Sequence, residues 1–208
     1  MNEELENMDD DFGNAYDPSD FKEEFERWRL LAEQEDDGEA QLNLGQMYQY
    51  GLGIKKDHKE AVKWYRLSAE QGDAEAQHSL GAMYENTKDH KKAFFWYWLS
   101  AKEGYAEGQL SLGTMYYKGE GVAQDYKEAF NWYLLSAEQG HTEAQYKLGA
   151  MYENGKGVPQ DNEEAVYWYR LSAEHEEMAQ CKLTAMNDRE TLSQFITDSI
   201  KSKYGKTP

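Results

Sequence analysis

Cysteine is almost absent from this sequence, and long apolar runs are absent altogether. The single cysteine, Cys181, has no second cysteine with which to form an internal disulfide. No stretch of about 18 consecutive apolar residues is present, so no membrane-spanning helix is predicted. The first residues, MNEELENMDDD, lack the basic and apolar regions of a secretory signal. Together these absences predict a cytoplasmic protein, because disulfides are rare in reducing compartments.

Basic residues are also scarce. The chain has 22 Lys and Arg against 40 Asp and Glu, a formal net charge of −18. Residues 1–38 contain 15 acidic and three basic residues, so this short region carries −12 of that charge. Such a field repels phosphate backbones, and the sequence therefore predicts no nucleic-acid partner. The acidity serves either solubility or the steering of a basic protein partner.

No residue set for catalysis, cofactor binding or metal binding is present. The five histidines lack the H-x-x-x-H spacing of zinc proteases, and Cys181 has no partner for a zinc site. The glycine-rich stretch GKGVPQD at 155–161 lacks the spacing of a phosphate-binding loop and recurs in related form, which favours a structural turn. We predict no catalytic, cofactor-binding or metal-binding residues, and expect Cys181 to be a small buried side chain.

What the sequence does contain is an internal repeat. Four related segments span residues 39–74, 75–106, 107–142 and 143–178, with lengths of 36, 32, 36 and 36 residues. A degenerate fifth start occupies 179–186. Regular spacing of this kind is the signature of stacked supersecondary units. We refer to these segments as repeats one to four.

The first part of each repeat has the pattern of an amphipathic helix. In repeat one Ala40, Leu44 and Tyr48 recur at every fourth residue and form one apolar stripe. A glycine follows the leucine in all four repeats, although mid-helix glycine costs about 1 kcal/mol. The four are Gly45, Gly81, Gly113 and Gly149. This repeated cost predicts close approach of a second helix, and the repeated methionines Met47, Met83, Met115 and Met151 are expected in the core.

The second part of each repeat is a helix that carries a Trp-Tyr doublet. An aspartate precedes it, with Glu three residues later in repeats one, three and four, which predicts a capping box. Glycines Gly72, Gly104 and Gly140 are expected to end these helices in the left-handed conformation. The connecting loops GLGIKKD, GEGVAQD and GKGVPQD contain two glycines, whereas repeat two has only TKDH, which predicts a tighter connection there.

Helical caps are expected at both ends of the array. Residues 21–38 have the pattern of an N-terminal capping helix, and 187–208 that of a C-terminal capping helix with a frayed tail. Residues 1–20 are predicted to be an acidic, disordered tail. The predicted fold is all-α: a right-handed α-solenoid of antiparallel helix pairs, with four full repeats, a partial fifth and helical caps over residues 39–186 and their flanks.

These residues resemble the Sel-one-like repeat (SLR) family, a cousin of the tetratricopeptide repeat. The family pattern A-x-x-x-L-G-x-x-Y-x-x-G-x-G-V, followed by D-x-x-x-A-x-x-W-Y-x-x-A-A-E-Q-G, recurs over about residues 39–186. Repeat two and the fifth start depart from it, as do serines where alanine is usual, at Ser68, Ser100, Ser136 and Ser172. The resemblance implies a curved solenoid that binds proteins or peptides and catalyses no reaction.

The resemblance also places first helices along a concave groove, and the variable outward positions of these helices become the candidate binding residues. Their mixture of aromatic, apolar and amide groups suits a peptide or helix ligand. The candidates are Leu42, Gln46, Gln49, Tyr50, His78, Glu85, Asn86, Leu110, Thr114, Tyr117, Lys118, Tyr146, Glu153 and Asn154. The alternative is that these positions are ordinary surface.

The function predicted from the sequence is a non-enzymatic protein-binding module with a basic protein or peptide partner. An inhibitor or immunity-type role is favoured, and an adaptor or scaffold in a regulatory complex is the alternative. A remote alternative is β-lactam binding or hydrolysis, as associated with cysteine-rich relatives, but those relatives carry a cysteine pair in each repeat. A monomer is expected rather than a homo-oligomeric structural piece, and no membrane partner is expected.

Overall fold

The computed structural model describes residues 21–34, 36–173 and 182–187. Over these ranges the chain forms helices and turns and no strand, which confirms the all-α prediction. The helices are α1 (Lys22–Gln34), α2 (Gly38–Tyr50), α3 (His58–Glu70), α4 (Ala74–Asn86), α5 (His90–Lys102), α6 (Ala106–Lys118), α7 (Tyr126–Glu138), α8 (Thr142–Asn154) and α9 (Asn162–Ala173). Residues 182–187 are also helical.

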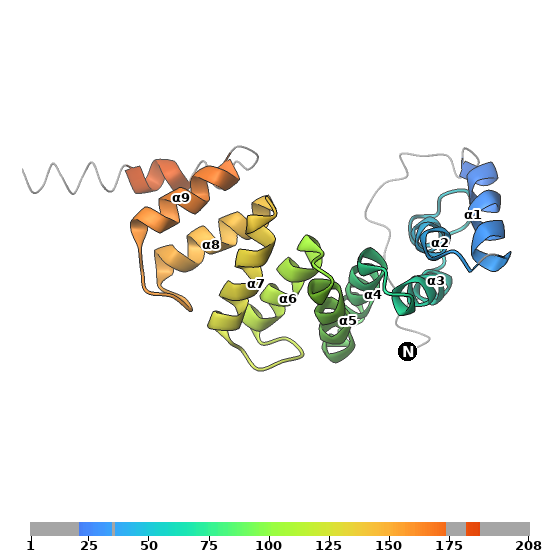
Figure 1. Ribbon diagram of the computed structural model, residues 1–208, viewed down its shortest axis with the longest axis horizontal. Helices are drawn as coiled ribbons and strands as arrows, with labels where there is room; N and C mark the ends of the chain where they lie inside the picture. Colours follow the sequence, from blue (N-terminus) through green and yellow to red (C-terminus); the bar gives the residue numbers. More distant parts are fainter. Residues whose placement is uncertain (1–20, 35, 174–181, 188–208) are drawn as a thin grey trace, which may run out of the picture. The chain divides into compact units, whose positions relative to one another are not determined.

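The chain divides into two compact units, Met1–Trp132 and Tyr133–Pro208, which we call unit 1 and unit 2. In unit 1 each helix from α1 to α6 contacts the next one along the chain, and successive helices reverse direction (Figure 1). In unit 2, α8 and α9 form one further helix pair. This architecture is the α-solenoid of antiparallel helix pairs that the repeats predict.

The mid-helix glycines let the two helices of a repeat approach each other, as predicted. A Cβ atom placed on Gly45 would lie 2.6 Å from Cδ1 of Tyr65, and one on Gly81 would lie at the same distance from Cδ1 of Tyr97. Both tyrosines are buried, with 1% and 2% of their surface exposed. A side chain at the glycine would therefore overlap a rigid, fully packed ring.

Aspartate side chains hold the first turn of the second helices. In α3 the Asp57 Oδ1 atom accepts hydrogen bonds from the backbone N–H groups of Lys59 and Glu60, at 2.9 and 3.1 Å. Asp125 and Asp161 do the same at the start of α7 and α9. These bonds satisfy amides that have no partner within the helix. The aspartate half of the predicted capping box is therefore confirmed.

The connecting loops differ in length but close with the same hydrogen bond. The amide N–H of the capping aspartate donates to the carbonyl oxygen of the tyrosine near the end of the first helix in every repeat. The pairs are Asp57–Tyr48, Asp89–Tyr84, Asp125–Tyr116 and Asp161–Tyr152, at 2.9 to 3.1 Å. Repeat two makes this bond without glycine, because Lys88 adopts a left-handed φ of 58°. The tighter connection predicted for repeat two is present.

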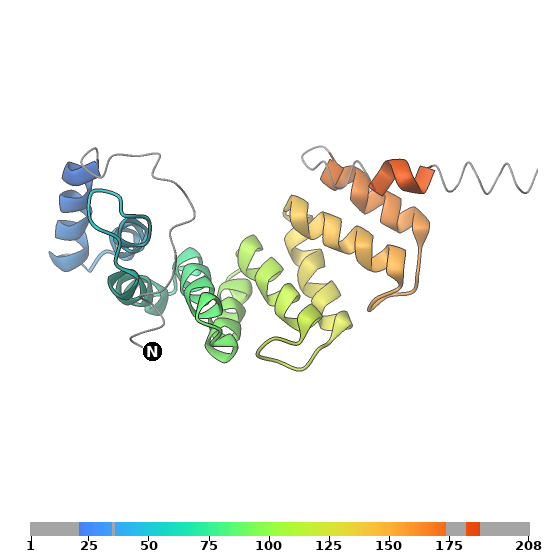
Figure 2. The ribbon, with the colours of Figure 1, turned by 180° about the vertical axis from the view of Figure 1, so that it is seen from behind.

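Each longer loop of unit 1 lies against the helix that precedes its own helix pair. The loop after α2 lies against the start of α1, and the loop after α6 lies against the start of α5. A Cβ on Gly53 would overlap the backbone carbonyl of Phe21 at the start of α1, and a Cβ on Gly121 would overlap that of His90 at the start of α5. Figure 2 shows the loop that follows α2 beside α1. Only glycine fits where backbone approaches backbone so closely. The loops therefore join neighbouring repeats as well as the helices within one repeat.

A buried glutamine at the start of α4, α6 and α8 joins each of these helices to the end of the preceding repeat. Gln77 Nε2 donates to the carbonyl of Ala69 in the preceding repeat at 3.1 Å, and Gln109 donates to Ala101 at 3.4 Å. In unit 2, Gln145 donates to Ala137 at 3.3 Å. These glutamines are buried, so each bond satisfies polar groups that water cannot reach.

Helix α1 covers the open face of α2. Its Phe25 and Ala32 are buried in a cluster with Leu44 and Met47 of α2, and the Phe25 ring meets the Tyr48 ring edge-on at 5.4 Å. Such a covering helix is what the first repeat of an array requires. The predictions made for residues 1–20, for Cys181 and for residues 188–208 lie outside the described residues.

Candidate protein-binding face

The first helices of unit 1 present a continuous face. Gln46 Nε2 on α2 donates to Glu75 Oε1 on α4 at 2.9 Å, and His78 Nε2 on α4 lies 3.2 Å from Ser111 Oγ on α6. Helices α4 and α6 also contact each other directly. The exposed side of α2, α4 and α6 is therefore one surface, which we call the first-helix strip. Its candidate residues are Gln46, Gln49, Tyr50, His78, Glu85, Asn86, Thr114, Tyr117 and Lys118.

The predicted outward positions of Leu42 and Leu110 are wrong. The two side chains are buried, with 8% and 9% of their surface exposed. Leu42 belongs to the cluster that includes Tyr65 of its own repeat and Leu80 of the next one. The leucine therefore fills space between successive repeats, which the wheel of a single helix does not reveal.

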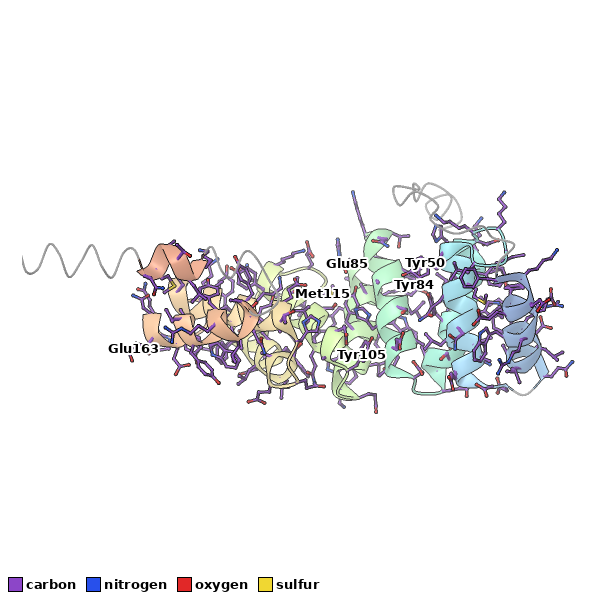
Figure 3. The ribbon with its side chains drawn as sticks, turned by 90° about the horizontal axis from the view of Figure 1, so that it is seen from above. Tyr50, Tyr84, Glu85, Tyr105, Met115 and Glu163 are labelled. Atoms are coloured by element: carbon purple, nitrogen blue, oxygen red, sulfur yellow. The ribbon has the colours of Figure 1, made fainter. Side chains whose placement is uncertain are left out.

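The remaining candidates differ in exposure along the strip. Tyr50 has 58% of its surface exposed, and Asn86 and Lys118 are exposed too. Gln46, Gln49, His78, Glu85, Thr114 and Tyr117 are half-buried. Tyr50 and Glu85 lie toward one edge of unit 1 and Tyr105 toward the other in the view of Figure 3. An exposed aromatic ring among half-buried polar groups is a typical anchor for a protein ligand.

Two of these candidate residues, Gln49 and Glu85, also form hydrogen bonds with buried tyrosines. The Tyr65 hydroxyl donates to Gln49 Oε1 at 2.5 Å, and the Tyr97 hydroxyl donates to Glu85 Oε2 at 2.6 Å. Burial raises the pKa of Tyr97, and its hydrogen bond to the Glu85 carboxylate raises it further. Gln49 and Glu85 thus stabilise the helix pair, so their substitution tests folding as well as binding.

Sequence reasoning missed the carboxylates at the other edge of the strip. Glu39, Glu75 and Glu107 stand at the same position of α2, α4 and α6, seven residues before Gln46, Ala82 and Thr114. Seven residues are about two helical turns, so each glutamate shares the face of the strip. They occur in every repeat, which was the available signal, but invariance within the array suggested framework rather than surface.

These carboxylates give the strip a negative field. Burial raises the pKa of Tyr105 to about 12, and the negative charges of Glu107, Glu75 and Asp73 contribute to that shift in this order. His78 lies near the same group, with its ring 5.7 Å from the Tyr105 ring and 5.3 Å from the Tyr97 ring. The edge of the strip at Tyr105 is accordingly anionic and aromatic.

Unit 2 carries the equivalent face of repeat four on α8. Tyr146 contacts the Tyr169 ring at 5.4 Å, and Glu153 accepts a hydrogen bond from the Tyr169 hydroxyl at 2.9 Å. Glu153 also pairs with Lys182 of the fifth segment at 2.9 Å. Asn154 is exposed. Glu153 therefore repeats the supporting role that Glu85 has in unit 1.

Neither a metal-binding cluster nor a membrane-spanning helix is present in the described part of the chain. In the ranges that the structure describes, no group of three or more His, Cys, Asp or Glu residues is arranged to hold a metal ion. The same ranges contain no helix that is both long and apolar enough to span a membrane. The first-helix strip contains aromatic, amide and carboxylate groups.

The fold defines an α-solenoid repeat protein. The Sel1 repeat model matches residues 38–73, 74–105, 106–141 and 142–176, starting one residue before each predicted repeat. The chain belongs to the Sel1-repeat family, and proteins of this family act as protein-interaction modules. Comparison with curated protein sequences gives no match.

Two solved structures with the same fold have similar sequence identities to this chain. A protective antigen of uropathogenic Escherichia coli that displays an SLR fold is 36% identical, with a TM-score of 0.77 over 80% of this chain. The chain spans 36% of that antigen's length. A Sel1 repeat protein from Oxalobacter formigenes is 35% identical, with a TM-score of 0.74, and the match covers 82% of this chain and 70% of that protein. The cysteine-rich protein B of Helicobacter pylori, 24% identical with a TM-score of 0.51 over 62% of this chain and 97% of that one, shares the fold alone.

Proposed function

We propose that the first-helix strip binds a basic protein or peptide and that the chain acts by occupying that partner. The observation that carries the proposal is that Tyr50 on α2 and Glu75 on α4 belong to one continuous surface. Gln46 lies one helical turn before the exposed Tyr50 on α2 and donates to Glu75 on α4. An accessible aromatic ring and a carboxylate thus share one surface across two repeats.

The negative charge of the strip and of the whole chain supports a positively charged partner. Glu39, Glu75, Glu85 and Glu107 line the strip against the single cation Lys118, which lies 3.5 Å from Glu120. The formal net charge of −18 would accelerate encounter with a cationic protein and slow encounter with an anionic one. An inhibitor or immunity-type role in the cytoplasm fits this mode of action. An adaptor role uses the same face, and we propose no enzymatic step for either.

The proposal is tested by capturing partners from native lysate on the immobilised chain at about 50 mM and about 300 mM salt. We expect a basic protein that is retained at low salt and weakened at high salt, with about tenfold lower affinity for Tyr50→Ser. The control is Tyr167→Ser in α9, an aromatic residue of similar exposure, 54%, that lies outside the strip. Equal binding to Tyr50→Ser and to the unchanged chain would exclude the strip as the site.

A further inference from the structure

Helix α5 has an outer face unlike that of α3. Lys91, Phe95, Trp98 and Lys102 are spaced by four, three and four residues, so they lie on one face. Phe95 has 51% and Trp98 36% of its surface exposed, and Lys91 and Lys102 are exposed as well. Lys102 Nζ lies 4.6 Å from the centre of the Trp98 ring. We call these four residues the α5 stripe.

The corresponding residues of α3 show that the fold does not require this stripe. The same positions in repeat one are Lys59, Lys63, Arg66 and Glu70, all of which are exposed. The two repeats share the glycine–tyrosine contact and the loop-closing hydrogen bond. The Phe95 ring meets the Trp96 ring edge-on at 5.2 Å, and half of its surface stays exposed. Exposed aromatic rings that share one face mark an interaction site.

The stripe is also cationic within an acidic chain. Residues 88–102 contain Lys88, Lys91, Lys92 and Lys102 against one acidic residue, Asp89. Residues 1–20 have the opposite character, with eight acidic and no basic residues and with the apolar residues Leu5, Met8, Phe12 and Tyr16 spread among the acids. The two segments are complementary in both charge and apolar content.

The N-terminal segment is long enough to reach the stripe. Phe21 marks the described start of the chain, and α1 and α5 belong to the same compact unit. Four steps between neighbouring helices separate α1 from α5, at most about 40 Å at 8–10 Å a step. The 16 residues from Leu5 to Phe21 span about 50 Å when extended. Attachment to the same chain gives the segment an effective concentration of about 1 mM, so a weak contact suffices.

We infer that residues 1–20 of this chain dock on the α5 stripe, with apolar side chains on Phe95 and Trp98 and carboxylates beside Lys91 and Lys102. This contact is separate from the first-helix strip and opposite to it in sign. The acidic segment thereby covers an exposed aromatic surface that would otherwise favour self-association.

Zero-length carbodiimide cross-linking of the full chain tests the docking, because it joins carboxylates to lysine amines only where they touch. We expect links from residues 1–20 to Lys91 or Lys102 in the unchanged protein. A mixture of ¹⁴N- and ¹⁵N-labelled chains should give links within one label. We expect about tenfold fewer such links in the double variant Phe95→Lys with Trp98→Arg, which carries the residues of α3.

The double variant separates docking from charge attraction, since it adds two positive charges to the stripe. Pure charge attraction would give more links, whereas docking on the rings gives fewer. Phe12→Ser with Tyr16→Ser provides the reciprocal variant and leaves the repeats unchanged, and links to Lys63 of α3 serve as an internal control. Mixed-label links would identify a second copy as the occupant and overturn the inference. Absence of links to Lys91 and Lys102, or links that neither variant reduces, would overturn it too.

Discussion

Repeats one and two differ in their connecting loops and outer faces but share the contact at the centre of the helix pair. Gly45 and Gly81 meet Tyr65 and Tyr97 at the same distance. Repeat one connects its helices through a glycine-containing loop that reaches α1, whereas repeat two connects them through a short turn with Lys88 at positive φ. The glycine–tyrosine contact and the hydrogen bond from the capping aspartate N–H to the tyrosine carbonyl are therefore the constant parts of the repeat. The length of the connecting loop and the residues of the outer face vary.

The largest effect is expected where a long loop meets the preceding helix. Gly121→Ala would place a Cβ against the His90 carbonyl at a φ of 73°, and we expect a loss of about 3 kcal/mol in the free energy of unfolding. Gly104→Ala is the matched control, because it has a φ of 88° and nothing within 4 Å, and should cost about 1 kcal/mol. Urea unfolding measures both. Equal losses would show that the loop does not support the neighbouring repeat.

The shared inner contact should respond alike in both repeats. Gly45→Ala and Gly81→Ala each force a Cβ to 2.6 Å from a buried ring. Overpacking costs about 1–3 kcal/mol and the helix propensity of alanine returns about 1 kcal/mol, so we expect a net loss of up to about 2 kcal/mol. Thermal and urea unfolding give the value. A gain in stability from either substitution would contradict the close-approach argument.

The buried tyrosines predict a loss of stability at high pH. Burial raises the pKa of Tyr65 and of Tyr97, whereas the unfolded chain releases these protons near pH 10. The unfolded state then binds fewer protons, so stability is constant below about pH 10 and falls above it by about 1.4 kcal/mol per pH unit for each tyrosine. Tyr97→Phe should reduce this slope by the contribution of one tyrosine, about 1.4 kcal/mol per pH unit, in unfolding measured from pH 9 to 11. An unchanged slope would mean that Tyr97 titrates normally.

A smaller contrast concerns the buried serines. Ser100 Oγ donates to the Ala74 carbonyl at 2.7 Å, whereas Ser68 Oγ is buried with no hydrogen-bond partner among the described residues. We expect Ser100→Ala to cost about 1 kcal/mol and Ser68→Ala to change stability by less than about 0.5 kcal/mol. Paired denaturation curves measure the difference. A larger loss at Ser68 than at Ser100 would show that the two repeats exchange these roles.

The smallest effect is expected on the outer face. Phe95→Lys with Trp98→Arg gives α5 the residues that α3 carries at the same exposed positions. The free energy of unfolding should change by less than about 0.5 kcal/mol, because both side chains are exposed and lie outside the buried cluster. Circular dichroism and urea unfolding test this. A loss above about 2 kcal/mol would show that the rings belong to the fold.

Much of the fold could be predicted from the sequence, because aligning the four repeats with one another shows which positions stay constant. The close approach of a second helix at Gly45 and Gly81 was predicted from the recurrence of glycine at one position of each repeat. That the rings of Tyr65 and Tyr97 fill these sites is seen only in the structure. The burial of Leu42 and Leu110 could not be predicted, because it depends on how one repeat stacks on the next. The place of Glu75 on the strip was missed for a different reason: identical residues in every repeat look like framework until their exposure and partners are known.

The proposal that a basic partner binds the first-helix strip is tested most directly by two charge-matched triple variants. Glu39→Gln, Glu75→Gln and Glu107→Gln remove three negative charges from the strip with little change in shape. Glu70→Gln, Glu103→Gln and Glu138→Gln remove three from exposed ends of the second helices. For the captured partner, we predict at least about tenfold weaker affinity and a flatter salt dependence for the first variant only. Equal weakening by both variants would reduce the effect to net charge and contradict a defined binding face.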